Sequence, residues 1–233
     1  MKQIFGVLAL LALVFSSCKK EIGENKKLDP KDQKKYDLMT DRPGSWWMYG
    51  GSDSTVTILS ATGRDSTIKD LFFSYYERVD TTSAEKNIMP EFFGKNADRY
   101  IFLQDLDGSF TKWIIVVFYK DGMLKDEKWI NIDEVDYMGL KFEIKVESAI
   151  KETDGVMTLN SGTFTDVIKI HHDFLGRVNI SGFDSEYTEL GYLDVWFVKG
   201  IGIIKKDLNI AISAGGFSKQ YRDSLLDYHF ETE

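Results

Sequence analysis

A strict alternation of apolar and charged side chains runs through Leu140–Glu147 and constrains the fold of this chain more than any other feature. Since successive side chains of a strand point to opposite faces, the pattern predicts a strand with one buried face. Asp-Gly pairs stand between strand-like runs at Asp107-Gly108, Asp121-Gly122 and Asp154-Gly155. Asp-Gly supplies the positive φ of tight hairpin turns, so each pair predicts a reversal between antiparallel strands.

Other stretches are rich in apolar and aromatic residues and favour interior strands. They are Leu71–Val79, Tyr100–Leu103 and Trp113–Tyr119. We expect about ten to twelve strands in all, the last near Leu226–Phe230. Successive hairpins give an antiparallel meander, so the sequence predicts a mainly β fold, a curved half-barrel or closed barrel with few short helices.

The first residues have the layout of a secretory signal. Lys2 gives a positive start, Ile4–Phe15 forms an apolar run, and the small residues Ser16-Ser17 precede Cys18. The apolar run is too short to cross a bilayer, because a spanning helix needs about 20 residues. We therefore expect that the chain is exported and that residues 1–17 are removed as a signal peptide.

Phe15-Ser16-Ser17-Cys18 resembles the lipobox of bacterial lipoproteins, and the following lysines resemble lipoproteins of Bacteroidota. The resemblance implies that Cys18 is lipidated, becomes the first residue of the mature chain and anchors it in a membrane. Phe15 departs from the more usual leucine. Lys19 stands where an aspartate marks inner-membrane retention in enteric bacteria, which implies the outer membrane and leaves the leaflet open. Cys18 is the only cysteine, so no disulfide is expected.

Residues 18–41 are dense in charge and poor in apolar side chains. Such a segment has little surface to bury, so we expect it to act as a flexible tether behind the lipidated cysteine. From Ser45 onward the chain is strand after strand, with neither a repeat of fixed period nor a second linker. This organisation predicts a single β-rich domain over residues 42–233.

Two short helices are expected beside the strands. Asp29-Pro30 is an N-cap followed by proline at the first helical position, which favours a helix to about Met39. Leu38 and Met39 would then dock on the domain. The second candidate covers Ser83–Phe93, where Pro90 limits the helix to a turn or two.

Three glycine-containing segments together resemble uncharacterised envelope lipoproteins whose fold is likened to the lipoprotein-carrier (LolA-like) half-barrel. They are Gly44–Tyr49, Ser161–Ile170 and Trp196–Lys205. The resemblance implies a curved antiparallel sheet with a concave apolar face, and it carries over no catalytic residues. The residues themselves predict that Gly200 and Gly202 bracket a tight reversal and that Gly162 opens a strand.

The first of these segments leaves an alternative open. Gly44-Ser45-Trp46 is also similar to the start of lipocalin-like barrels, which implies a closed barrel with an internal ligand pocket. The other two segments are not part of the lipocalin pattern. In either fold one of Trp46 and Trp47 should fill the core while the other lies nearer the surface, because the two side chains alternate along a strand.

Candidate metal sites are weak. Asp105-Leu106-Asp107-Gly108 begins like a calcium loop, but apolar residues occupy its second half, so a hairpin turn is expected. His171-His172 would point to opposite faces of a strand and could not readily share one ion. His229 is distant in sequence, and no cysteine completes a zinc set. We predict no metal and no cofactor.

Catalytic and nucleic-acid-binding signatures are missing as well. The sequence has no Gly-x-Ser-x-Gly, and its one thiol is the cysteine assigned to lipidation. Gly200-Ile201-Gly202 lacks the third glycine and the helix of a phosphate loop. The formal net charge of −8 argues against nucleic acid as a partner, because phosphate binding requires clustered Lys and Arg.

Two classes of function remain open, and a structural spacer fits the sequence almost as well. We expect a non-enzymatic binding or scaffold lipoprotein, whose sheet holds an apolar ligand or packs on an envelope partner. The alternative is a hydrolase that acts on polysaccharide or peptide through carboxylates without a sequence signature. A continuous apolar groove would favour the first, and two carboxyl groups across an open cleft the second.

Overall fold

The computed structural model describes residues 33–34, 36–85, 87–105, 113–137, 140–180, 183–212 and 217–232. The residues assigned to the signal peptide, Cys18 and most of the tether lie outside these ranges. The described chain is all β, so the expectation of a few short helices is wrong within it. Accordingly, no membrane-spanning helix is found among the residues described.

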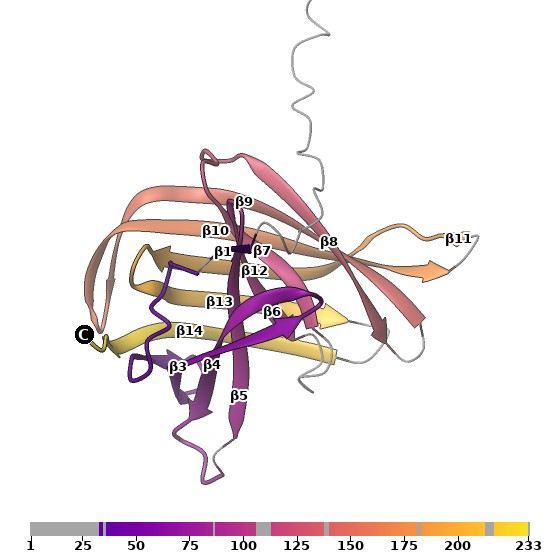
Figure 1. Ribbon diagram of the computed structural model, residues 1–233. Helices are drawn as coiled ribbons and strands as arrows, with labels where there is room; N and C mark the ends of the chain where they lie inside the picture. Colours follow the sequence, from indigo (N-terminus) through magenta and orange to yellow (C-terminus); the bar gives the residue numbers. More distant parts are fainter. Residues whose placement is uncertain are drawn as a thin grey trace, which may run out of the picture.

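The strands form one antiparallel sheet that curves on itself (Figure 1). Its spatial order is β7-β6-β5-β4-β3-β2-β14-β13-β12-β10-β9-β8, with β1 paired to β5 and β11 to β10. The bounds are β1 Gln33–Lys34, β2 Trp46–Gly51, β3 Val56–Ile68, β4 Leu71–Asp80, β5 Ile88–Asn96, β6 Arg99–Asp105, β7 Trp113–Lys120, β8 Lys128–Tyr137, β9 Leu140–Leu159, β10 Gly162–Ile180, β11 Phe183–Asp184, β12 Thr188–Val198, β13 Gly202–Ile212 and β14 Phe217–His229.

The sheet consists of two meanders joined by its first and last long strands. β2 to β7 follow each other in space as they do in sequence, and so do the strands from β8 to β14 apart from the short β11. β14 then pairs antiparallel with β2, where Tyr49 lies opposite Leu225 and Trp46 opposite His229. The predicted antiparallel meander is confirmed, and the pairing of β14 with β2 joins the two meanders into one continuous sheet whose edges are β7 and β8.

The barrel closes between β7 and β8 through side chains rather than a backbone ladder. The Trp129 indole N–H donates to the Val117 carbonyl at 2.8 Å. The Asn131 amide donates to the Ile115 carbonyl at 2.7 Å and accepts from the Val117 N–H at 3.2 Å. Asp133 accepts from the Ile115 N–H at 2.8 Å. These bonds satisfy the otherwise open edge of β7, and the result is a nearly closed barrel. Its strand number and its seam distinguish it from an eight-stranded lipocalin-like barrel.

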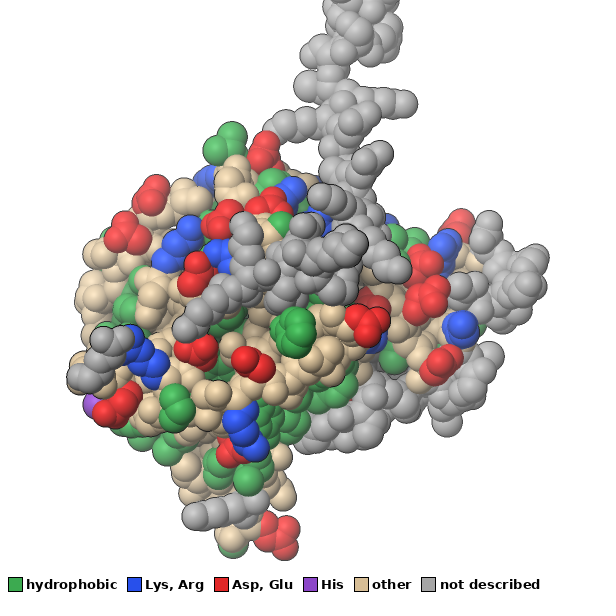
Figure 2. Space-filling view, viewed as in Figure 1, with side chains coloured by type: hydrophobic (Ala, Val, Ile, Leu, Met, Phe, Trp, Pro, Cys, Tyr) green, Lys and Arg blue, Asp and Glu red, His purple; other side chains and the backbone are tan. Residues whose placement is uncertain are grey.

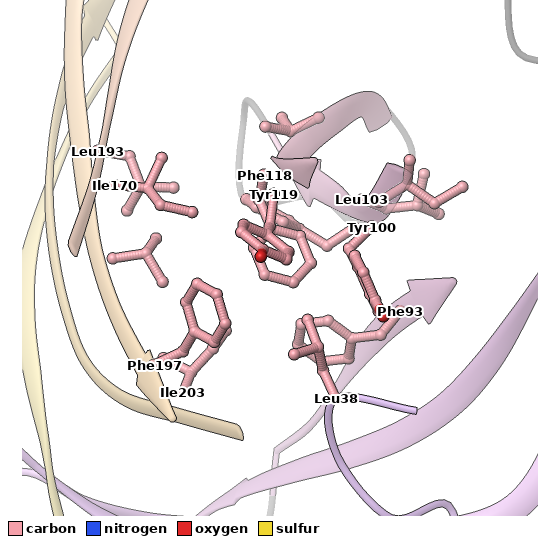
Figure 3. Packing of buried hydrophobic residues seen from close by; sticks show 14 of the residues in the cluster. Leu38, Phe93, Tyr100, Leu103, Phe118, Tyr119, Ile170, Leu193, Phe197 and Ile203 are labelled. Atoms are coloured by element: carbon pink, nitrogen blue, oxygen red, sulfur yellow. The ribbon is translucent and has the colours of Figure 1, made fainter. Parts of the chain in front are cut away.

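The β6–β7 hairpin lies inside the curve of the sheet. Both faces of these strands are buried, from Tyr100 to Asp105 and from Ile114 to Tyr119. Figure 3 shows Phe118 and Tyr119 with Phe197 on one side and Phe93 on the other. The Phe197 ring centroid lies 6.1 Å from that of Phe118 and 5.0 Å from that of Tyr119. The concave apolar face that the resemblance implies is therefore largely covered by the chain's own aromatic hairpin.

The segment ahead of β2 packs against one end of the barrel. Tyr36, Leu38 and Met39 are buried, and the Tyr36 ring stacks on Phe93 with 5.7 Å between centroids. The Gly200 N–H donates to the Leu38 carbonyl at 3.2 Å. The predicted docking of Leu38 and Met39 is confirmed, and the packed structure begins before residue 42.

Neither of the expected helices is present among the described residues. Gln33–Lys34 pairs as a strand with the C-terminal end of β5, and residues 36–40 are not helical. Ile88–Asn96 is β5 itself. Pro90 is tolerated there because β6 pairs with β5 only from Phe93 onward, so no neighbour on that side needs the missing N–H.

The two glycine predictions for turns are confirmed. Gly162 begins β10, and Gly200 and Gly202 flank the turn between β12 and β13 with φ of 84° and 104°. A Cβ on Gly202 would come within 2.3 Å of Met39 Cγ, so the close approach of the docked segment also requires glycine here.

The prediction that each Asp-Gly pair forms a hairpin turn is not confirmed for any of the three pairs within the described residues. Asp107-Gly108 lies outside the described residues. Asp121-Gly122 does form a turn, but the flanking β7 and β8 share no ladder. Asp154-Gly155 is not a reversal: it lies within β9, where Asp154 has φ of 56° and the register with β10 shifts near Val167. Positive φ occurs in a β-bulge as well as in a turn, which explains the wrong prediction. The chain reverses five residues later, at Asn160-Ser161.

The predicted alternation is confirmed on β9 and β2. Ile144 and Val146 are buried while Lys141 is exposed. Trp47 is fully buried and its indole N–H donates to the Ile201 carbonyl at 2.7 Å, whereas Trp46 lies nearer the surface. The apolar faces identified from the sequence therefore point into the barrel.

Candidate functional site

A pocket of about 200 Å³ lies between β3–β7 on one side and β13–β14 on the other. It uses the N-terminal end of β5, whereas the segment before β2 packs near the C-terminal end of that strand. Its wall is apolar and aromatic, with Met89, Phe92, Phe102, Leu103 and Trp113 among the lining residues. Six charged side chains also line it: Arg78, Glu91, Asp105, Lys206, Lys219 and Asp223.

Four of these form what we term the lumenal charge cluster, namely Arg78, Glu91, Lys206 and Asp223. Arg78 is its centre and is 6% exposed. Its Nε donates to Glu91 Oε1 at 2.5 Å, and its Nη1 donates to Thr57 Oγ1 at 2.7 Å and lies 3.5 Å from Asp223 Oδ2. The guanidinium carbon is 4.8 Å from the centroid of the Tyr49 ring.

Lys206 joins the cluster from the opposite wall. Its Nζ lies 3.5 Å from Glu91 Oε2, across a sequence separation of 115 residues. β5 and β13 are not neighbours in the sheet, so this contact crosses the barrel interior. Lys206 also lies directly opposite Asp223 in the β13–β14 register. The cluster thus connects β4 and β5 to β13 and β14 through the lumen.

Burial alone would raise the pKa of Glu91, but the positive charges of Arg78 and Lys206 outweigh it and lower the pKa to about 2. Glu91 is therefore a carboxylate at any physiological pH. Burial, opposed by Arg78 and Lys206, holds the pKa of Asp223 above its usual value. The two acids of the cluster are thus pushed in opposite directions by their surroundings.

Burial lowers the pKa of Lys206, and the neighbouring carboxylate of Glu91 only partly opposes this. For Arg78 the balance is reversed: burial would lower its pKa, while Glu91 and Asp223 raise it. Arg78 is consequently a permanent cation, and Lys206 is the base of the cluster whose charge is least well compensated.

A second ion pair lies on the same pocket. Lys219 Nζ is 3.8 Å from Asp105 Oδ2, and Lys219 is about one-third exposed while Asp105 is buried. The Gln104 amide donates to the Asp105 carbonyl at 2.8 Å. Outside the lumen, Figure 2 shows acidic and basic side chains interspersed over the visible face rather than gathered by sign. The pocket differs from that surface because its charges are buried beside aromatic rings.

The histidine pair behaves as the strand geometry predicts. His171 points outward, 2.6 Å from Asp194 Oδ1 and 2.9 Å from Asp173 Oδ1. His172 is fully buried, and its Nδ1 lies 2.8 Å from Ser148 Oγ. His229 stacks on Trp46 at the β14–β2 pairing. In the described ranges no group of three His, Cys, Asp or Glu side chains is placed to hold a metal ion.

The other residues weighed in the sequence are Asp105, the glycines Gly200 and Gly202, and Cys18. Asp105 lines the pocket, but the following residues of its calcium-like motif are outside the described part of the chain. Gly200-Ile201-Gly202 is the β12–β13 turn. Cys18 is also outside the described residues, so its lipidation stays a prediction.

None of the four cluster residues was among the predicted site residues, although a signal for them exists. On β13, Lys206 takes an inward position between the buried Ile204 and Leu208. On β4, Arg78 follows the buried Tyr76 on the same face. A charge at the inward position of an alternating strand is the sequence signal for such a cluster.

Neither a protein-family model nor a curated protein sequence matches this chain. Among solved structures it is similar to a candidate lipoprotein of Parabacteroides distasonis, with 12% identity and a TM-score of 0.51, covering 84% of this chain and 100% of that one. It is also similar to a candidate exported protein of Bacteroides fragilis described as having a YmcC-like fold, with 11% identity and a TM-score of 0.48, covering 83% and 99%. The first similarity shows a shared fold, and the predicted resemblance to uncharacterised lipoproteins with a barrel fold is confirmed at that level.

Proposed function

We propose that the protein is an exported lipoprotein of the cell envelope, held in the outer membrane through lipidated Cys18. The signal layout of residues 1–17 and the lipobox resemblance of Phe15–Cys18 support this. The P. distasonis protein that shares the fold is itself described as a candidate lipoprotein. Several acyl chains on one cysteine give stable anchoring where a single chain would be marginal.

Replacing Cys18 by alanine should remove the anchor. We expect the wild-type protein in the membrane fraction and the C18A variant either soluble or unprocessed at residues 1–17, because no other thiol can accept the lipid. Fractionation, with a mobility shift after metabolic labelling by a fatty acid, measures both effects. Ser17→Ala keeps a small residue before the cysteine and should behave as wild type. A processed C18A variant that stays membrane-anchored would contradict the proposal.

We propose further that the barrel is a non-enzymatic binding module whose ligand enters the pocket between β3–β7 and β13–β14. The observation that carries this is the lumenal charge cluster, which places four charged side chains beside an aromatic wall. Ligand sites combine an apolar lining with a few placed polar groups in this way. Among the described residues the β6–β7 hairpin and the segment before β2 cover other parts of the interior, which supports this pocket as a ligand site.

Filling the pocket should abolish binding. Met89 lines the pocket, whereas Ile88 beside it on β5 is 55% exposed. We expect native mass spectrometry of the gently purified mature protein to detect a bound molecule in wild type and Ile88→Trp. In Met89→Trp its occupancy should fall at least about tenfold, since an indole would occupy the small cavity. A domain that never retains a molecule would count against the binding module.

The hydrolase alternative rests on one observation. Glu91 and Asp223 contact the same guanidinium, that of Arg78, while their pKa values are moved in opposite directions. Pairs of carboxyl groups whose pKa values are moved apart in this way often serve as acid and base. Here both are engaged by buried cations, which favours a binding role. Turnover of cell-wall peptide or glycan that is lost in both E91Q and D223N would favour the hydrolase.

A further inference from the structure

The lysines of the pocket have hydrogen-bonding capacity to spare. An ammonium group has three N–H donors. Among the described residues, the one acceptor near Lys206 Nζ is Glu91 Oε2, at the long distance of 3.5 Å. Lys206 is only 8% exposed and lines the pocket, so a further acceptor for its N–H donors has to come from within the pocket. A buried cation with unused donors carries a free-energy cost that an additional acceptor in the pocket would relieve.

Lys219 also has N–H donors that no short ion pair occupies, and it lies nearer to solvent than Lys206. Its Nζ lies 3.8 Å from Asp105 Oδ2, which is beyond hydrogen-bonding distance, and 5.9 Å from the centroid of the Tyr221 ring. The side chain is 32% exposed. Lys219 and Lys206 are therefore two cations on one pocket, a buried one and a more exposed one, neither of them held by a short ion pair.

Two of the three acids of the pocket, Glu91 and Asp223, are less able to receive a ligand than Lys206. Glu91 already accepts the Arg78 Nε–H at 2.5 Å and faces Lys206 with its other oxygen. Asp223 lies 3.5 Å from Arg78, and burial raises the pKa of its carboxyl. A cationic ligand would meet Glu91 and Asp223 already engaged by Arg78, and Asp105 already facing Lys219. An anionic ligand would meet N–H donors of Lys206 that no short hydrogen bond occupies.

The rest of the pocket sets the size and character of the ligand body. A cavity of about 200 Å³ is only somewhat larger than the ~150 Å³ apolar cavity that can hold a benzene molecule, so the body must be small. Phe92 and Trp113 pack edge-to-face with 5.6 Å between centroids, and Phe102 and Leu103 lie on the same wall. Such walls accommodate a flat or aliphatic group.

We propose that the pocket binds a small organic anion with an aromatic or short aliphatic body, whose carboxylate accepts hydrogen bonds from Lys206. Lys219 adds attraction from its more exposed position. This deepens the proposed function, because it rests on the pocket being the ligand site and names the class of ligand. The lysines supply the specificity for charge, and the aromatic wall holds the body.

Three probes with one body and different charge test the proposal. Calorimetric titration of the mature chain with 3-phenylpropanoate, 3-phenylpropanamide and 3-phenylpropylammonium should give the order anion, amide, cation. We expect the carboxylate to bind at least about tenfold more tightly than the amide, in line with the gain from a charge-assisted hydrogen bond. Equal binding of all three, or tightest binding of the ammonium probe, would overturn the anion assignment and leave the pocket itself standing.

Substitution of the lysines identifies the group responsible. Lys206→Met should weaken phenylpropanoate binding about ten- to a hundredfold and leave the amide nearly unchanged. Lys219→Met, a more exposed substitution without risk to the core, should weaken it a few-fold. Lys205→Met is the matched control, since Lys205 lies next in the chain on the other face, over the Trp196 ring at 4.5 Å. Near-ultraviolet circular dichroism shows whether each variant is folded.

The outcomes separate the two proposals. Failure of phenylpropanoate to bind, or binding insensitive to both Lys206→Met and Lys219→Met, would overturn the anion assignment. The binding module would then still be decided by the bound molecule that Met89→Trp is expected to lose. Loss of phenylpropanoate binding in Met89→Trp but not in Ile88→Trp would place the anion in this pocket.

Discussion

Glu91→Gln is expected to lower the free energy of unfolding by about 3–5 kcal/mol, because it leaves Arg78 and Lys206 buried without their shared carboxylate. The glutamine keeps the shape of the side chain and one acceptor oxygen. It cannot compensate the charges of Arg78 and Lys206, residues that are only 6% and 8% exposed. The loss should appear as a lower urea midpoint with an unchanged slope.

The β3–β4 hairpin offers a matched control for this variant. Arg64 and Glu77 form an ion pair of the same chemical type on the outer surface, with side chains 62% and 31% exposed. Glu77→Gln should cost at most about 1 kcal/mol, because water solvates both groups whether or not they are paired. Similar small losses in the two variants would show that the lumenal charge cluster is well hydrated and would contradict the burial argued above.

Removing a cation as well should restore part of the stability. Glu91→Gln combined with Lys206→Met leaves the oppositely charged Arg78 and Asp223, which lie 3.5 Å apart, and Arg78 keeps its bond to Thr57 at 2.7 Å. The double variant should therefore lose less than the sum of the two single variants. Strict additivity would mean that Glu91 and Lys206 do not interact across the lumen.

Local features of the sequence were sufficient for much of the sheet. Alternation identified the half-buried face of β9, and apolar runs identified β4, β6 and β7. Both predictions succeeded because the burial of a strand determines the pattern of apolar residues within that strand. Gly200 and Gly202 identified a turn because the positive φ of a turn is also a local property that favours glycine. Asp154 failed because positive φ is common to hairpin turns and β-bulges, and only the partner strand distinguishes them.

The candidate site depends on information that no single segment holds. Glu91 and Lys206 are 115 residues apart on strands that are not neighbours, so only the curvature of the whole sheet brings them together. The seam between β7 and β8 also depends on the whole fold. The Asn131 amide can donate to the Ile115 carbonyl, in place of a neighbouring strand, only when the barrel has closed. Inward charge at Lys206 could be read from the sequence, but its partner could not.

The adjacent histidines of β10 should give the stability of the domain two pH dependences of opposite sign. Burial, and then the nearby His171, lower the pKa of His172 to about 3. Its Nε2 has no hydrogen-bond partner among the described residues, so a proton there would be buried without an acceptor. For His171 the bond to Asp194 raises the pKa despite partial burial. One histidine resists protonation in the folded state and the other favours it.

The two signs follow from proton linkage. Between about pH 6.5 and 3 the unfolded chain protonates residue 172 while the folded chain does not, so the folded state loses about 1.4 kcal/mol per pH unit, roughly 5 kcal/mol in total at pH 3. Above pH 6.5 both states are neutral and the effect vanishes. His171 contributes stability that is fully present below its unfolded pKa and lost as the pH rises through its folded pKa.

His172→Asn and His171→Asn separate these contributions. Asparagine can keep a bond to Ser148 Oγ, which lies 2.8 Å from His172 Nδ1, while removing the titration. Relative to wild type, His172→Asn should gain stability as the pH falls from 7 to 4, and His171→Asn should lose it, because the Asp194 partner is then without its imidazolium. Urea denaturation at several pH values measures both slopes. Parallel slopes for the two variants would contradict the opposite environments of these neighbours, whereas opposed slopes would show that a single step along β10 separates the barrel interior from its solvated face.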